Sequence, residues 1–246
     1  MFKIFTKIYR KFTNFFQINW IKTLYINFTM LQFSDALKFP IIIFGRCRFV
    51  SLEGNIEFNT PLQFGLLGFG QRYEVFKIEN GSAELNIQGK IIVNGRTQFG
   101  YDYKIFVAKN AELQLGNMAS MASGAKVICT EKIVLGDFCR MGSECQLIDT
   151  NFHDLKDTVT NILAPKSNAI VLGNYNFISN RVTILSKAKT PDYCTIASNS
   201  LLSKSYINLK SNVLIGGIPA KLIKENITRD WEGEKEKLEN YLTIKL

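Results

Sequence analysis

Aliphatic residues recur at every sixth position through the second half of this 246-residue chain. The longest run, counted in steps of six from Leu172, is Leu172, Ile178, Ile184, Thr190, Ile196 and Leu202, and five of these six residues are aliphatic. Two shorter runs share the spacing: Leu135, Met141, Leu147 and Leu115, Met121, Val127. A period of six matches neither the 3.6 residues of an α-helical turn nor the two-residue alternation of a single strand.

A parallel β-solenoid accounts for this period, because each flat side of a coil takes about six residues and ends at a tight corner. One aliphatic side chain per side then points inward and stacks on its equivalents in neighbouring coils. Small and polar residues between these positions, as in "LGNYNFISNRVTILSKAK", let the backbone turn at the corners. The sequence therefore predicts an all-β solenoid.

Three regions are expected: a helical leader over residues 1–45, the solenoid over 46–220 and a charged C-terminal helix over 221–246. The leader begins "MFKIFTKIYRKFTNFF", in which aromatic residues form one helical stripe and basic residues lie largely off it. Such a helix either lies on an anionic membrane surface through residues 1–18, packs on the rest of the protein, or forms an oligomer contact. No apolar run reaches the roughly 18 residues that span a bilayer.

The formal net charge of +9 favours anionic partners. Nucleic acid is not expected, because a solenoid offers no groove-reading helix and the aromatic residues do not alternate with Arg in a base-stacking pattern. The five cysteines form no C-x-x-C pair, which argues against a disulfide scaffold or a cysteine zinc site and favours a cytoplasmic location. A single histidine excludes a three-histidine zinc centre.

Three segments carry a resemblance to a known family, and they occur in the order "VLGNYNFISNRVTIL", "TIASNSLLSKSYI" and "IGGIPAKLIK". The chain resembles the hexapeptide-repeat acyltransferases. That resemblance implies a left-handed parallel β-helix and a homotrimer with active sites between neighbouring subunits. It also implies acetyl-CoA as co-substrate, with no permanently bound cofactor and no metal.

The segment "INFTMLQFSDALKFPIIIFG" is similar to the leader of a subgroup associated with bacterial surface polysaccharides. This similarity implies O-acetylation of a sugar hydroxyl for capsule or lipopolysaccharide, in the cytoplasm or at the inner face of the membrane. Two alternatives stay open. One is N-acetylation of an amino sugar or another small amine, and the other is a non-catalytic trimeric solenoid that acts as a binding module.

The only histidine, His153, lies in "QLIDTNFHDLKD", where residues 149–168 interrupt the six-residue period. A solenoid that loses its period there should extrude a loop, with the histidine near the loop's start. A neutral imidazole can remove the proton of an attacking hydroxyl and return it to the departing thiol. The resemblance implies the same catalytic role. Asp149 and Asp154 are both candidates to hold the imidazole in one tautomer, and the sequence does not choose between them.

The resemblance also implies where the coenzyme and the acceptor bind. Three lysines match the positions at which the family has basic residues near the coenzyme: Lys204, Lys221 and Lys224. Lysine is a suitable point-charge partner for phosphate. Three further residues match turn positions that line the pantetheine arm of the coenzyme in the family: Asn180, Ser198 and Ser200. Ser123, on the rung before the histidine, is a candidate to orient the acceptor.

Overall fold

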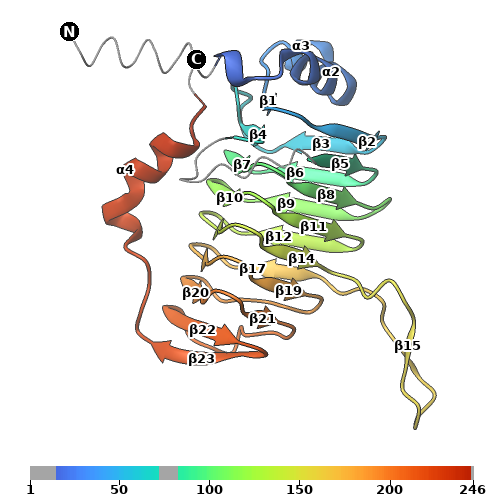
Figure 1. Ribbon diagram of the computed structural model, residues 1–246, viewed down its shortest axis with the longest axis vertical. Helices are drawn as coiled ribbons and strands as arrows, with labels where there is room; N and C mark the ends of the chain where they lie inside the picture. Colours follow the sequence, from blue (N-terminus) through green and yellow to red (C-terminus); the bar gives the residue numbers. More distant parts are fainter. Residues whose placement is uncertain (1–14, 72–82, 245–246) are drawn as a thin grey trace.

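The computed structural model describes residues 15–71 and 83–244. Short strands coil into a solenoid with three flat sides, and each side is a parallel sheet apart from one antiparallel pair, β22 with β23, at the last edge (Figure 1). The fold is a left-handed parallel β-helix, as the family resemblance implies. Its coils stack from the N-terminal helices at one end to the β22–β23 hairpin at the other (Figure 1).

Each side is named here by its first strand. The β1 sheet contains β1 (Ile41–Ile43), β4 (Leu67–Phe69), β7 (Thr97–Phe99), β10 (Ala119–Met121), β13 (Arg140–Met141), β18 (Phe177–Ile178), β20 (Cys194–Ile196), β22 (Val213–Gly217) and β23 (Ala220–Glu225). The β2 sheet contains β2 (Arg48–Leu52), β5 (Glu84–Ile87), β8 (Lys104–Val107), β11 (Lys126–Cys129), β14 (Gln146–Ile148), β19 (Thr183–Leu185) and β21 (Leu201–Leu202). The β3 sheet contains β3 (Asn55–Phe58), β6 (Lys90–Val93), β9 (Glu112–Leu115), β12 (Lys132–Leu135) and β17 (Ile170–Leu172).

The six-residue runs form the core of the solenoid. Every residue in the three runs is buried, and none is more than 4% exposed. Strand register stacks them into three columns: Leu115–Leu135–Leu172, Met121–Met141–Ile178–Ile196 and Val127–Leu147–Ile184–Leu202. The polar member, Thr190, donates its hydroxyl to Asn176 at 2.7 Å. Inward stacking of one side chain per flat side is therefore confirmed.

Coil length changes along the solenoid, which explains why the period is clearest near the C-terminus. Register partners are 20 residues apart between Leu85 and Ile105, and 22 apart between Ile105 and Val127. Between Ile184 and Leu202 the interval is 18, which is three sides of six. The extra residues of the earlier coils break the strict sextets without altering the inward columns.

Helices lie at the N-terminal end of the solenoid and along one side of it (Figure 1). α2 (Trp20–Met30) and α3 (Phe33–Ala36) fall in the range assigned to a leader, and this range also contains strand β1. The striped segment at the N-terminus lies mostly outside the described residues. At the other end, β23 occupies the first residues of the range expected to be a C-terminal helix, and helix α4 spans Trp231–Leu242. No helix in the described ranges has the length and apolar character needed to cross a bilayer.

The C-terminal segment runs back along the solenoid (Figure 1). Trp231 packs edge-on against Phe138 and Tyr175, which stack with each other at 5.0 Å between ring centroids. Beyond α4, Ile244 joins Ile42 in a buried cluster beside the first coils. The segment after β23 therefore links the last coils to the first.

Candidate functional site

An arm leaves the solenoid between β14 and β17 (Figure 1). At its root Thr150 forms an antiparallel bridge with Ser167, and farther out β15 (Leu155–Lys156) pairs antiparallel with β16 (Leu163–Ala164). At its tip Asp157 accepts hydrogen bonds from the backbone N–H groups of Val159 and Thr160, and these bonds hold the pKa of its carboxyl below the usual value. The interruption of the period thus produces a hairpin arm.

His153 lies at the root of this arm and its side chain is exposed. Its backbone N–H donates to the carbonyl of Asn151 at 2.7 Å, which holds the local turn. The flanking apolar residues Phe152 and Leu155 are exposed as well. The imidazole is therefore open to a ligand that approaches the outer surface of the solenoid.

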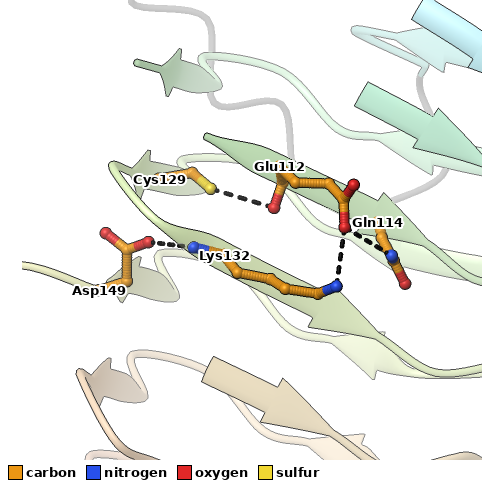
Figure 2. Close-up of polar contacts among 5 residues, drawn as sticks. All are labelled: Glu112, Gln114, Cys129, Lys132 and Asp149. Atoms are coloured by element: carbon orange, nitrogen blue, oxygen red, sulfur yellow. Dashed lines mark hydrogen bonds and ion pairs between the residues drawn. The ribbon is translucent and has the colours of Figure 1, made fainter. Parts of the chain in front are cut away.

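Asp149 is close to His153 in sequence but belongs to the solenoid wall. Its buried carboxylate accepts four hydrogen bonds of 2.8–3.0 Å, from the N–H and hydroxyl of Thr130 and from the N–H groups of Glu131 and Lys132. Figure 2 shows the contact with Lys132, whose ammonium group pairs with Glu112 on the neighbouring strand. The carboxylate of Asp149 thus fastens the turn between β11 and β12 to the root of the arm.

The second carboxylate candidate lies on the arm itself. Asp154 pairs with Lys166 at 3.1 Å, and both side chains are about half exposed. Neither Asp149 nor Asp154 contacts the imidazole of His153 within the described part of this chain. Of the two, only Asp154 is exposed and lies outside the hydrogen-bond network of the solenoid wall.

Lysines gather at the corner from which the arm departs. When the strand register is continued by one residue, Asp149 after β14 is level with Ser186 after β19. Lys204 after β21 then lies opposite residues 186–188, because Ile184 pairs with Leu202 and Lys189 with Ser205. Exposed lysines therefore stand at this corner in the next two coils, Lys187 beside Ser186 and then Lys204. Parallel strands are about 4.8 Å apart, so Lys204 lies roughly two strand spacings, or about 10 Å, along the corner from the arm's root.

Sequence reasoning singled out Lys204 but missed Lys187 and Lys189. All three are exposed, and Lys189 bridges Val171 on one side and Ser205 on the other through its backbone. Lys187 and Lys189 lie in "KAKTPD", a segment in which the six-residue repeat is blurred. The signal was available in the spacing, because Lys187 and Lys204 are 17 residues apart, close to one coil.

Lys221 and Lys224 lie on β23, at the end of the solenoid, and are exposed. Tyr206 connects this strand with Lys204. Its hydroxyl donates to the carbonyl of Ala220 at 3.1 Å, and the ammonium of Lys204 lies 5.7 Å from its ring centroid. The segments that carry Lys204 and Lys221 are therefore neighbours through Tyr206.

The polar turn residues predicted for ligand binding mostly hold the coils together. Asn180 accepts from the N–H of Ser143 at 3.0 Å, and Ser200 donates to Ala197 at 2.7 Å while accepting from Gly217 at 3.1 Å. Ser123 is buried and accepts from the N–H of Tyr101 at 2.9 Å. Ser198, by contrast, is exposed. These contacts make the turns rigid, whatever else the side chains bind.

All five cysteines are buried and unpaired, as expected of small residues in a solenoid wall. Burial raises the pKa of the Cys47 and Cys145 thiols to about 11 and that of Cys194 to about 12, and it raises the pKa of Cys129 and Cys139 further. A buried thiol with a raised pKa is a poor nucleophile. Within the described residues there is also no cluster of side chains that would hold a metal ion.

The sequence matches no protein-family model and no curated protein. Among solved structures, the chain is similar to the hexapeptide transferase family protein from Anaplasma phagocytophilum, with a TM-score of 0.50, 16% identity and coverage of 80% of this chain and 93% of that one. It is also similar to the polySia-specific acetyltransferase NeuO, with a TM-score of 0.46, 16% identity and coverage of 82% of this chain and 85% of that one. A third similar structure is a point mutant of AntD, an N-acyltransferase from Bacillus cereus solved with dTDP and coenzyme A, with a TM-score of 0.44, 14% identity and coverage of 81% of this chain and 88% of that one. The chain therefore has the hexapeptide-repeat fold.

Proposed function

We propose that the protein transfers an acetyl group from acetyl-CoA to a sugar hydroxyl, with His153 as general base. One observation carries the proposal. The only histidine of the chain stands exposed at the root of an arm, and the corner from which that arm departs continues into the exposed lysines Lys187 and Lys204. A base and an anion-binding ridge thus share one edge of the solenoid.

In the proposed reaction the imidazole of His153 takes the proton of the acceptor hydroxyl as its oxygen attacks the thioester carbonyl carbon. Backbone N–H groups at a solenoid turn stabilise the tetrahedral oxyanion. The carbon–sulfur bond then breaks, and the imidazolium returns the proton to the leaving thiolate. Asp154 is the carboxylate proposed to hold the imidazole tautomer, since the oxygens of Asp149 already accept four hydrogen bonds.

Acetyl-CoA enters this scheme as a co-substrate. Its phosphates would lie along the corner lysines, with Lys204 and, at the solenoid end, Lys221 and Lys224 as point charges. Lysines spaced one coil apart suit an elongated ligand that runs parallel to the solenoid axis. The exposed Ser198 and the turn at Asn180 are proposed to line the pantetheine arm, and Ser123 the approach of the acceptor.

A homotrimer is part of the proposal, with each site in a cleft between subunits. Five large apolar side chains of the arm are more than half exposed in the single chain, up to 89% for Val159. Such a surface is expected to be covered by a neighbouring subunit. The acceptor is proposed to be a sugar of a surface polysaccharide or its precursor, acetylated in the cytoplasm.

The test is a donor-by-acceptor screen of the full chain with acetyl-CoA and a panel of sugars, sugar nucleotides and small amines, followed by thiol release. The His153→Gln variant should lower kcat by about 10³-fold, within the range of general base catalysis, while Tm stays unchanged because the side chain is exposed. Thr158→Ala, which changes an exposed polar residue at the tip of the same arm, is the matched control. Full activity of His153→Gln would overturn the assignment, and turnover of amines alone would replace the sugar acceptor.

A further inference from the structure

Helix α2 buries polar side chains and exposes apolar ones. Its buried residues are Thr23 and Asn27, whose polar side chains are fully buried, together with the apolar Ile26 and Met30. Its exposed positions include Ile21, Leu24 and Phe28. A surface helix normally buries its apolar stripe and exposes its polar one, so this arrangement needs a physical reason.

The buried polar residues cap the open edge of the solenoid. β1 is the first strand of its sheet, and its outer backbone groups would otherwise lack partners. Asn27 donates to the carbonyl of Ile41 at 2.6 Å and accepts from the N–H of the same residue at 3.2 Å. Thr23 accepts from the N–H of Ile43 at 3.0 Å. The helix therefore directs the side chains of Thr23 and Asn27 at the edge of β1.

This orientation leaves the other side of α2 apolar and exposed. Its side chains continue into α3 and the following turn, and together they form the surface Ile21, Leu24, Tyr25, Phe28, Phe33 and Leu37, called here the α2 face. Ile21 is 80% exposed and Phe33 70%. Nine of the nineteen large hydrophobic side chains that are exposed in the described ranges lie between residues 15 and 50. The N-terminal end is thus the richest apolar surface of the described chain.

The described residues at the same end carry a net positive charge. Residues 15–50 contain four Lys and Arg and a single acidic residue, Asp35, a net charge of +3. Within the described part, Lys22 lies beside the α2 face, with its ammonium 4.7 Å from the ring centroid of Phe49. Arg46 and Arg48 follow on the first coil and are exposed.

We infer that the α2 face is a docking surface for an anionic lipid bilayer. Aromatic and aliphatic side chains with flanking cations, on a helix too short to span, are the features of a helix that lies in the membrane interface. A second copy of the chain is the weaker occupant, because two faces of the same positive charge repel each other. The surface is distinct from residues 1–18, and the inference does not depend on acyl transfer.

The experiment is flotation of the full chain with vesicles of phosphatidylcholine alone or of an equal mixture with phosphatidylglycerol. The triple variant Ile21→Gln/Leu24→Gln/Phe28→Gln keeps good helix formers and leaves the buried side intact. The control variant Ile207→Gln/Ile218→Gln/Ile223→Gln removes three exposed apolar side chains from the last coils, away from the arm. We expect the wild type and the control to float with the mixed vesicles, and the α2 triple variant to partition at least about tenfold less. Raised salt should weaken binding of the wild type.

Circular dichroism and the molar mass in solution accompany the flotation, so that a misfolded variant is recognised. If the folded α2 variant floats as well as wild type, the inference is wrong. It is equally wrong if deletion of residues 1–14 alone abolishes binding while the α2 variant retains it, because the preceding segment would then make the contact. If the wild type does not bind the vesicles and the α2 variant has a lower molar mass than the wild type, the inference is also wrong, and a second copy of the chain is the occupant of the α2 face.

Discussion

The solenoid wall and the arm that leaves it use similar residues in opposite ways. Asp149 is fully buried and its oxygens accept four hydrogen bonds, whereas Asp154, five residues later, holds one exposed ion pair. Aliphatic side chains stack inward in the wall, and those of the arm face outward. Wall residues are committed to the fold of one chain. Arm residues remain available to a ligand or a second subunit, which is why the candidate base lies there.

The largest expected difference between the two regions is in the free energy of unfolding. Ile184→Ala, in the middle of an inward column, should cost about 3 kcal/mol, because the cavity has stacked neighbours above and below that cannot collapse into it. Ile162, on the arm, is 66% exposed in the single chain, so at a protein concentration too low for subunits to associate Ile162→Ala should change the stability by no more than about 0.5 kcal/mol. Urea unfolding followed by circular dichroism at one fixed protein concentration measures both.

An equal loss of unfolding free energy for the two substitutions would show that the wall and the arm do not differ in packing. A cost above about 1 kcal/mol for Ile162→Ala would mean that the arm is packed in the folded assembly as tightly as the wall. In that case its stability would also rise with protein concentration, because the packing partner would be another subunit.

The inward columns could be predicted from the sequence because burial leaves a periodic trace in residue type. Leu172 to Leu202 repeat at the spacing of one solenoid side, and the structure stacks them as expected. The corners leave a weaker trace, since polar residues occupy them whether they bind ligands or fasten turns. Asn180 and Ser200 matched ligand positions by spacing, yet their side chains make hydrogen bonds between coils.

Two other features left only a weak trace in the sequence. Lys187 and Lys204 are 17 residues apart, close to one coil, but coil length varies along the chain, and the strand register is what brings the two lysines to one corner. The reversed side of α2 depends on which strand edge needs a cap, so it follows from the tertiary structure. The apolar spacing of that helix alone would predict the opposite face to be buried.

A smaller effect is expected from the carboxylate that joins the wall to the arm. Asp149→Asn should destabilise the protein by about 2 kcal/mol, because an amide presents N–H donors to the N–H groups of Glu131 and Lys132. The matched control is Asp137→Asn at another corner, where the carboxylate accepts from the N–H of Asn117. An asparagine already does the same in the next coil, as Asn174 accepts from the N–H of Asp137.

The control should therefore cost less than about 0.5 kcal/mol in thermal or urea unfolding. If Asp149→Asn is as harmless as the control, the four hydrogen bonds do not anchor the arm's root. Asp149 would then become available again as the partner of His153.

The smallest expected change in stability belongs to Asp154→Ala. Its ion pair with Lys166 is exposed on both sides, so its loss should alter the free energy of unfolding by less than about 0.5 kcal/mol. If Asp154 holds the imidazole tautomer, however, kcat should fall by about tenfold or more with little change in KM, and Asp154→Glu should restore part of it. Lys166→Ala removes the same ion pair but keeps the carboxylate, and it should leave kcat near the wild-type value. Equal losses in both alanine variants would instead assign the effect to the conformation of the arm, and Asp154 would have no separate part in catalysis.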